Sequence, residues 1–346
     1  MTELVGLTLE ELEAWALDLG EPRYRGRQLA RWIYQRRATS FAEMTDLPQA
    51  LRERLAATAT LSRLRVLARA EASNDLTTKA LLELHDRRTI ETVMMRYDDG
   101  RRTVCVSTQV GCGMGCTFCA TGLAGLTRNL SPGEIVDQVL LMARECGERP
   151  THVVFMGMGE PLANYAATLR AVRLLNAPYG PKVGMRNLTI STVGLVPQIR
   201  QLAQERLQLT LAVSLHAPTD ELRSQLVPIN HRWPIADLLA ATREYAATTG
   251  RRVTFEYVLM AGVNDRDEHA RRLAGALAGA GAHVNVIPWN PVYGMQYQRP
   301  PTSAVHRFVG LLRAGGIAAT VRIDRGVDID AACGQLQRTH GAEVRV

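Results

Sequence analysis

After residue 101 the chain alternates between strand-like and helix-like stretches, and this alternation restricts its fold more than any other feature. Apolar or β-branched runs predict strands at 103–109, 151–157, 186–192, 208–215, 252–260 and 283–288. Helical patterns lie between them, at roughly 132–146, 163–176, 195–205, 234–248 and 266–279, and a further helix and strand follow near 302–314 and 317–323. The pattern predicts an α/β protein with a parallel sheet, either an incomplete (β/α) barrel or a doubly wound sheet.

The segments that follow the predicted strands have an unusual composition. They are rich in glycine or in polar residues, and they lie at 111–119, 157–161, 191–194, 214–216 and 288–291. The carboxyl ends of parallel strands form the active face of α/β folds. We therefore expect these segments to meet at one mouth.

The first hundred residues follow a different pattern. Thr8 and Glu11 fit a capping box at the start of a helix, a second helix is predicted from about Tyr24 to Arg37, and short strand-like runs follow between about 61 and 97. We expect a helical accessory domain at 1–60, a β linker segment at 61–100 and an α/β core at 101–346.

The second predicted helix is basic. The chain has a net charge of +7, and Lys79 and Lys182 are its only lysines. Codon bias in a GC-rich genome accounts for the excess of arginine over lysine, but it does not create net charge. For any single arginine here, a position on a solvated face is the plain alternative. As a group without acidic residues, the arginines favour contact with an RNA or DNA backbone. The group comprises Arg23, Arg25, Arg27, Arg31, Arg36 and Arg37.

The overall composition is that of a globular protein. Of the 346 residues, 46% are apolar and 22% are charged, which argues against disorder, collagen-like repeats and coiled coil. The six cysteines are too few and too closely spaced for a secreted disulfide scaffold. With no targeting segment and no apolar run of membrane-spanning length, we expect a cytoplasmic protein that does not enter a membrane.

Three cysteines are the strongest chemical signal. Cys112, Cys116 and Cys119 lie on the loop after the first predicted strand, with three and then two residues between them. Structural zinc is the obvious alternative, but it needs a fourth ligand that this spacing does not supply. Three thiolates on a four-iron cluster leave one iron open to a small molecule. Cys146, inside a predicted helix, is interpreted as structural.

A cysteine motif of this spacing, with Phe118 before its last member, resembles that of the radical S-adenosylmethionine (SAM) superfamily. Over essentially the whole chain, the sequence more closely resembles the RlmN/Cfr family of RNA methyltransferases. The segments that carry this resemblance, in order, are 105–112, 118–122, 156–164, 214–217, 227–230, 288–291 and 330–336. The resemblance implies a partial (β/α)6 barrel with a small helical N-terminal domain and a β linker segment.

The same resemblance implies the cofactors. One [4Fe–4S] cluster would be held by the three spaced cysteines, and two SAM molecules would be used per turnover. Reduction of one SAM would give a 5′-deoxyadenosyl radical. The residues that would line SAM are Gly159, Glu160, Ser191, Ser214, Leu215, His216 and Asn290. A satisfied core histidine is the plain alternative for His216.

The resemblance also gives three residues catalytic roles. Cys333 would carry a methyl group that becomes bonded to C2 of an adenine, and Cys105 would release the product through a transient disulfide with Cys333. Glu91 would accept the C2 proton. The loop at 96–102 is about one residue longer than the family pattern, which affects the alignment of Glu91. A small buried core residue is the alternative for Cys105, and an exposed strand position is the alternative for Glu91.

The implied substrates are an adenine of 23S rRNA near the peptidyl-transferase centre and the adenine at position 37 in the tRNA anticodon loop. A reduced flavodoxin- or ferredoxin-type protein would donate electrons, and the enzyme would act as a monomer. Two alternatives stay open. One is a Cfr-like enzyme that methylates adenine C8, and the other is a non-catalytic, zinc-containing RNA-binding module.

Overall fold

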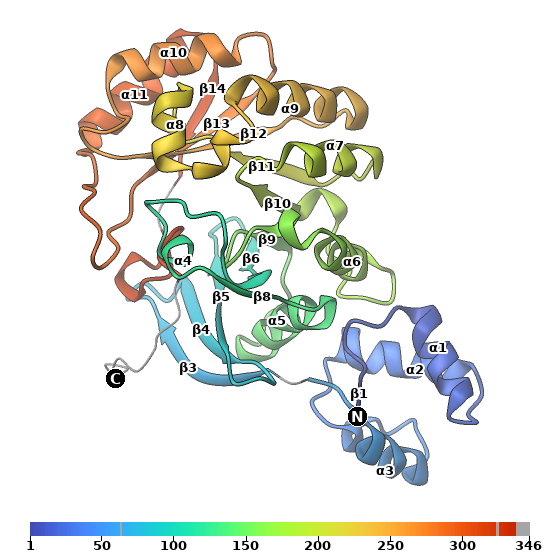
Figure 1. Ribbon diagram of the computed structural model, residues 1–346. Helices are drawn as coiled ribbons and strands as arrows, with labels where there is room; N and C mark the ends of the chain where they lie inside the picture. The colour runs from blue at the N-terminus through green and yellow to red at the C-terminus, as the bar shows by residue number, and fades with distance from the viewer. Residues whose placement is uncertain (63, 323–324, 337–346) are drawn as a thin grey trace.

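A single ten-stranded sheet forms the frame of the protein in the computed structural model, which describes residues 1–62, 64–322 and 325–336 (Figure 1). The strand order is β14-β13-β12-β11-β10-β9-β6-β5-β4-β3. Seven consecutive strands of this order are parallel, and they follow the order of the chain. In a doubly wound sheet the order of the strands reverses partway along the chain, which does not happen here. Of the two predicted folds, the structure is therefore the incomplete (β/α) barrel. The seven are β6 (Arg102–Cys105), β9 (His152–Phe155), β10 (Leu188–Thr192), β11 (Thr210–Ser214), β12 (Thr254–Leu259), β13 (His283–Pro288) and β14 (Ala318–Val321).

The connections between these strands are helical, as predicted. The main crossover helices are α5 (Pro132–Glu145), α6 (Tyr165–Asn176), α7 (Val196–Gln204), α9 (Ile235–Thr249), α10 (Asp267–Leu277) and α11 (Thr302–Ala314). Short helices α4 (Ala120–Leu123) and α8 (Asp220–Leu226) and 3-10 turns at Phe41–Glu43, Pro161–Asn164, Met185–Asn187, Pro228–His231 and Val327–Ile329 lie between the longer elements.

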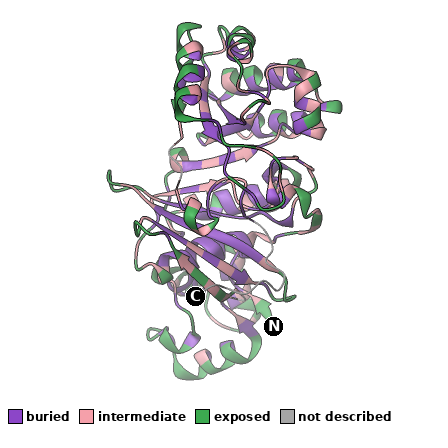
Figure 2. Ribbon diagram, turned by 90° about the vertical axis from the view of Figure 1, so that its left-hand side faces the viewer, coloured by how far each residue is buried: buried purple, intermediate pink, exposed green. Residues whose placement is uncertain are grey.

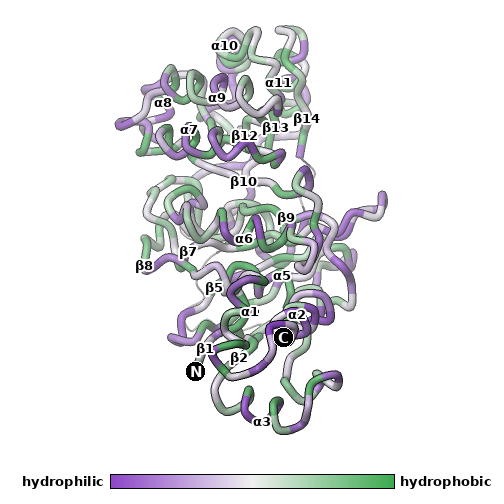
Figure 3. Tube along the Cα trace, turned by 90° about the vertical axis from the view of Figure 1, so that its right-hand side faces the viewer, coloured by the Kyte–Doolittle hydropathy of each residue, from purple (hydrophilic) through white to green (hydrophobic). Residues whose placement is uncertain are grey.

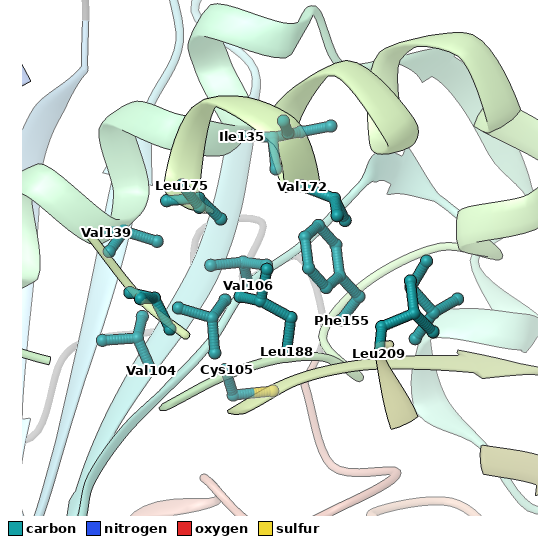
Figure 4. Packing of buried hydrophobic residues seen from close by; sticks show 14 of the residues in the cluster. Val104, Cys105, Val106, Ile135, Val139, Phe155, Val172, Leu175, Leu188 and Leu209 are labelled. Atoms are coloured by element: carbon teal, nitrogen blue, oxygen red, sulfur yellow. The ribbon is translucent and has the colours of Figure 1, made fainter. Parts of the chain in front are cut away.

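The strands are the most buried part of the molecule, and the outer faces of the helices are exposed (Figure 2). Val104 and Val106 point into the apolar layer under α5 and α6, where they lie near Val139 and Val172 (Figure 4). The sulfur of Cys105 points to the opposite side of the strand. Because neighbouring residues of a strand face opposite sides, two valines in the helix layer direct Cys105 to the interior of the half-barrel.

The predicted β linker segment belongs to this sheet. It forms β3 (Arg65–Glu71), β4 (Thr77–Glu83) and β5 (Thr89–Arg96), an antiparallel run whose last strand pairs with β6. The segment therefore extends the barrel sheet past its first strand.

Two predicted elements differ from the structure by more than two residues at one end. The strand predicted over 103–109 stops at Cys105, because the Ser107 amide donates to the side chain of Gln138 rather than to a neighbouring strand. The chain then forms β7 (Gln109–Gly111), which pairs with β8 (Leu126–Asn129) in a separate ribbon. The helix predicted to Arg37 is α2 (Tyr24–Ala30) followed by a π-helical turn at Arg31–Arg36.

The N-terminal segment packs beside α5 and α6. It comprises a small pair of strands, β1 (Thr2–Glu3) and β2 (Ala59–Thr60), and helices α1 (Leu9–Asp18), α2 and α3 (Gln49–Thr58). Arg170 of α6 donates to the carbonyl of Gly6 at 2.8 Å, and the rings of Tyr34 and Tyr179 lie 6.0 Å apart. These helices occupy the end of the molecule farthest from α10 and α11 (Figure 3).

Candidate active site

A cavity lies at the carboxyl ends of the parallel strands, where the sequence predicts a mouth. It has about 940 Å³ of empty space, part of it open to solvent, which is within the size range of small-molecule sites. Its wall includes residues from all five predicted loop segments: Cys112, Gly157, Ser191, His216 and Asn290 are examples.

The three spaced cysteines all line this cavity. Burial raises the pKa of the Cys112 thiol to about 12, and burial together with the neighbouring thiols raises the pKa of Cys116. Among the described residues, no three His, Cys, Asp or Glu side chains converge closely enough to hold one metal ion. Three buried thiols around one cavity fit a larger inorganic cluster, whose positive iron ions would stabilise the thiolates.

Glycine allows the loops to approach one another at the cavity. Gly159 has a φ of +103°, and a Cβ there would lie 2.6 Å from Cβ of Gln109. A larger residue would separate the loop after β9 from the strand that leads to the cysteines. Gly159 itself lines the cavity, so its position and that of its neighbours in the wall depend on this close approach.

Glu160 lines the cavity, but its carboxylate also joins two loops. One oxygen accepts from the amide of Leu162 at 2.9 Å and the other accepts from the amide of Val193 at 2.8 Å. Burial raises the pKa of Glu160 to about 7, although both hydrogen bonds act in the opposite direction. The carboxylate therefore fixes the loops after β9 and β10 relative to each other.

His216 is both buried and part of the cavity wall. Its Nδ1 accepts a hydrogen bond from the amide of Val258 at 3.0 Å, and burial lowers its pKa to about 3. The ring is therefore neutral, with its proton on Nε2, which leaves one hydrogen-bond donor for a ligand. Ser191 and Ser214 line the same cavity. Leu215 is 1% exposed and is not among the described wall residues, so the structure does not place it in the cavity wall.

A second, smaller cavity contains the other two predicted cysteines. Cys105, from β6, and Cys333, from the C-terminal segment, both line it. Cys333 and Asn290 also line the first cavity, and Asn290 Nδ2 donates to the carbonyl of Cys333 at 3.4 Å. Burial raises the pKa of Cys105 to about 12. The structure thus brings the two outlying cysteines together, next to the cavity that holds the other three.

Glu91 is buried on β5 and does not line either cavity among the described wall residues. Its carboxylate lies 3.0 Å from Nζ of Lys79, and Lys79 also donates to the carbonyl of Asp330 at 3.2 Å. One lysine therefore links the predicted base to the segment that carries Cys333. The alternative of an exposed strand position for Glu91 is wrong.

The predicted basic group is not free of acids in space. Glu13 of α1 forms ion pairs with Arg23 at 2.6 Å and with Arg27 at 3.3 Å, and Glu21 lies 3.9 Å from Arg25. These acids precede the basic stretch in the sequence, and the helix pair α1 and α2 brings them alongside. Arg31 and Arg36 are exposed, Arg36 stacks on Trp32 at 4.1 Å, and Arg37 is half-buried.

Two arginines of the site were missed by sequence reasoning. Arg223 is fully buried and donates to the carbonyls of Val193, Ser214 and Leu215, so it holds together the loops after β10 and β11. Arg322, just after β14, lines both cavities. In a chain with 39 arginines, no local pattern distinguishes these two.

Comparison with known proteins identifies two families along the chain. Residues 2–61 match the ribosomal RNA large subunit methyltransferase N-terminal domain, and residues 106–274 match the radical SAM superfamily. The two matches cover the N-terminal helices and most of the parallel sheet.

Relatives and a solved structure match over nearly the whole chain. The "probable dual-specificity RNA methyltransferase RlmN" of Symbiobacterium thermophilum is 54% identical over 97% of this chain and 92% of that protein. The protein of the same name from Moorella thermoacetica is 52% identical over 97% of both chains. The crystal structure of a radical SAM methyltransferase from Sphaerobacter thermophilus is 52% identical, with a TM-score of 0.94 over 97% of this chain and 99% of that one.

Proposed function

Since this chain belongs to the RlmN family of radical SAM RNA methyltransferases, we propose that it methylates C2 of adenine in two RNAs. The targets would be an adenine of 23S rRNA near the peptidyl-transferase centre and adenine 37 in the tRNA anticodon loop. The relatives are named as dual-specificity enzymes, which supports two RNA substrates. The observation that carries the proposal is the placement of Cys105 and Cys333 on one cavity, beside the cavity of the three spaced cysteines.

The cofactors of this family are a [4Fe–4S] cluster and SAM. When bound, they supply the methyl group and the one-electron chemistry. Cys112, Cys116 and Cys119 would hold the cluster. The backbone at Gly159 and the Nε2 proton of His216 would contact SAM, together with Ser191, Ser214 and Asn290. Because the chain belongs to a family that uses these cofactors, the alternative of a non-catalytic, zinc-containing module is set aside.

Three residues would handle the RNA base. Cys333 would carry the methyl carbon to C2 of the adenine. Forming this bond removes a hydrogen atom from the methyl group, and the C2 hydrogen leaves as a proton and an electron. Glu91 would take the proton, and the one-electron chemistry of the bound cofactors would accept the hydrogen atom and the electron. The Cys105 thiolate then attacks the Cys333 sulfur, so that an S–S bond forms and the bond from that sulfur to the methylene carbon breaks. The electron pair stays on the methylene group, which takes up a proton and becomes the methyl group. An external thiol reduces the disulfide before the next cycle.

The test is replacement of Cys105. A Cys105→Ala variant retains the methyl carrier but lacks the thiolate that releases the product, so the protein should become covalently trapped on its RNA. Denaturing gels followed by mass spectrometry would detect the adduct on Cys333. A matched Cys146→Ala variant should give no adduct, because that thiol lies at the end of α5, outside both cavity walls. Normal methylation by Cys105→Ala, without an adduct, would refute the assigned role.

Position C8 is the second candidate target, because the Cfr branch of the family shares the cluster and both outer cysteines. Nuclease digestion of the RNA product and mass spectrometry of the modified adenosine distinguish the two. We expect 2-methyladenosine; 8-methyladenosine would assign the chain to the other reaction.

The N-terminal helices would hold the RNA backbone. The structure directs the test to Arg31 and Arg36, which are exposed, rather than to Arg23, Arg25 and Arg27, which lie beside Glu13 and Glu21. Arg31→Glu with Arg36→Glu should weaken RNA binding about tenfold or more at low salt and flatten its salt dependence, because phosphate contacts release counterions. The iron content should stay unchanged. Equal binding by the variant and the parent protein would exclude this surface.

We further propose a cytoplasmic monomer that receives electrons from a reduced flavodoxin- or ferredoxin-type protein. Within the described residues, every helix is too short or too polar to span a bilayer. Size-exclusion chromatography with light scattering would test the monomer, and SAM cleavage with each purified donor would test the electron source.

A further inference from the structure

Arg322 is placed where the two cavities meet. It follows β14, and its backbone amide continues the ladder by donating to the carbonyl of Val286 at 2.8 Å. Its side chain crosses the interior of the half-barrel, where Nη1 lies 3.5 Å from the sulfur of Met156, the residue after β9. Arg322, Cys105 and Cys333 all line the smaller cavity.

Within the described residues, the nearest carboxylate to the Arg322 guanidinium is only a distant ion-pair partner. Nη1 of Arg322 lies 3.8 Å from Oε2 of Glu256, which is too long for a hydrogen bond, and that oxygen has no hydrogen-bond partner among the described residues. Burial also raises the pKa of Glu256, which favours its neutral form. A positive charge in the interior thus remains available to other anions.

The two cysteines are the anions that this charge can stabilise. The pKa of Arg322 is raised, chiefly by Cys333 and to smaller extents by Glu256, Tyr97 and Cys105, while burial acts in the opposite direction. In return, Arg322 acts to lower the pKa of Cys105, against the larger effect of burial and the effect of Cys333. Among the described residues, the other charged or titratable groups around it include Glu256, Arg325 and Tyr97, with Arg325 stacked on the Tyr97 ring at 4.3 Å.

We propose that Arg322 is a positioning residue whose charge favours the thiolate forms of Cys333 and Cys105 over their thiols in two successive steps of the proposed reaction. The first is methylation of Cys333, in which the thiolate bonds to the methyl carbon of SAM and S-adenosylhomocysteine leaves. The second is attack of Cys105 on the Cys333 sulfur. In each case the thiol proton passes to solvent, and the guanidinium offsets the charge left on sulfur. The inference rests on the proposed function of the two cysteines.

Thiol alkylation tests the inference without using activity. The cluster-loaded enzyme, kept anaerobic, is treated with iodoacetamide between pH 6 and 9, and the labelling rates of Cys105, Cys333 and Cys146 are read by peptide mass spectrometry. The same spectra show how much Cys333 already carries a methyl group, and only the remainder is counted. Cys146 is the internal reference, because it lies next to Arg96 and away from both cavities.

Arg322→Met should slow alkylation of Cys105 and Cys333 about tenfold or more at pH 7.5, because an opposite charge this close changes a pKa by about one unit or more. Higher pH should restore the rate, and Cys146 should not change. Arg322→Lys, which keeps the charge, should recover most of the rate. Arg325→Met, a matched change in the same cavity wall, should stay within about twofold.

Unchanged rates for both cysteines in Arg322→Met would overturn the inference. If Arg322→Met also alters Cys146 or loses iron, the Lys variant decides: recovered labelling supports a role of the charge, and labelling that stays slow refutes it. Failure of the proposed function looks different. Cys333→Ala would then still methylate RNA, whatever the thiol rates are.

Discussion

Gly111 begins the cysteine loop in a conformation that other residues rarely adopt. Its φ is +79°, and a Cβ there would lie 1.9 Å from the carbonyl oxygen of Gly125. The amide of Cys112 donates to that same carbonyl at 3.0 Å. The position of Cys112, the first of the three spaced cysteines, therefore depends on a residue without a side chain.

Gly111→Ala should displace the loop and reduce the bound cluster. We expect iron and sulfide per chain to fall by about half or more, measured after anaerobic reconstitution. Gly147→Ala is the matched control: its φ of +65° imposes similar strain, roughly 1–2 kcal/mol, but no atom lies within 4 Å of the added Cβ. Full cluster content in Gly111→Ala would contradict the argument.

Single residues were predictable where spacing or a resemblance marked them. The three cluster cysteines were predicted as one set, and all three line the cavity. Lys79 and Arg322 were not predictable as site residues, because each acts by position in space. Lys79 donates to the carbonyl of Asp330, which is far away in the sequence. Arg322, just after the last strand, lines the same cavity as Cys105 of the first parallel strand.

At the scale of elements, β4 and β5 place Lys79 and Glu91 in a buried ion pair. The side chains are 16% and 4% exposed, so each charge depends on its neighbours for compensation. A second pair on the same antiparallel sheet, Arg65 with Glu83 at 2.7 Å, has its arginine 69% exposed. The two pairs allow a direct comparison of buried and surface charge.

Lys79→Met alone should destabilise the protein by about 3 kcal/mol, because it removes a cation that lies 3.0 Å from a buried carboxylate. The double variant Lys79→Met with Glu91→Gln should recover part of that loss. Guanidinium unfolding of the four proteins gives a coupling energy, which we expect to exceed about 1 kcal/mol. The same cycle on Arg65 and Glu83 should give less than about 1 kcal/mol. Equal couplings would show that burial does not strengthen the Lys79 pair.

Periodicity predicted the existence of the crossover helices and parallel strands, since each buries one face or a continuous apolar run. It did not predict where pairing stops. The first parallel strand, β6, ends because the amide of Ser107 donates a hydrogen bond to the side chain of Gln138 on α5. These two residues are 31 positions apart in the sequence. The π-helical turn at Arg31–Arg36 likewise has no sequence signal of its own.

At the scale of the whole molecule, Asp137 lies where the N-terminal segment meets α5. It is 1% exposed, accepts a hydrogen bond from Ser62, and lies 3.8 Å from Arg144. Burial raises its pKa from 3.8 to about 6. Between these values the folded state binds more protons than the unfolded state, so the contribution of Asp137 to stability falls as pH rises.

Asp137→Asn should remove this pH dependence, because the amide does not titrate. Between pH 5 and 7.5, the wild type should lose about 1–1.5 kcal/mol of unfolding free energy relative to the variant, given the two pKa values. Urea unfolding at several pH values, followed by circular dichroism, would measure the difference. A constant difference between the two proteins over this range would show that Asp137 does not titrate as described.

The overall arrangement was predictable in part. The resemblance indicated a partial barrel with N-terminal helices, and the sheet order agrees. The packing of the N-terminal segment on α5 and α6 was not predictable, because it depends on few and distant contacts, such as Arg170 with Gly6. The same packing brings Glu13 beside the arginines of α2, which the linear charge pattern could not show.

Cys105 is fixed on both sides of its strand. Its ladder partners are Val93 on antiparallel β5 and Val154 on parallel β9, and its carbonyl accepts from the hydroxyl of Thr92 at 2.8 Å. Cys333, by contrast, lies in a turn outside the sheet and is only half-buried. In the proposed cycle, an external thiol would therefore reach the disulfide at Cys333. Reduction would then proceed in a fixed order: attack at Cys333 expels Cys105 as the free thiolate, and a second external thiol releases Cys333 from the mixed disulfide.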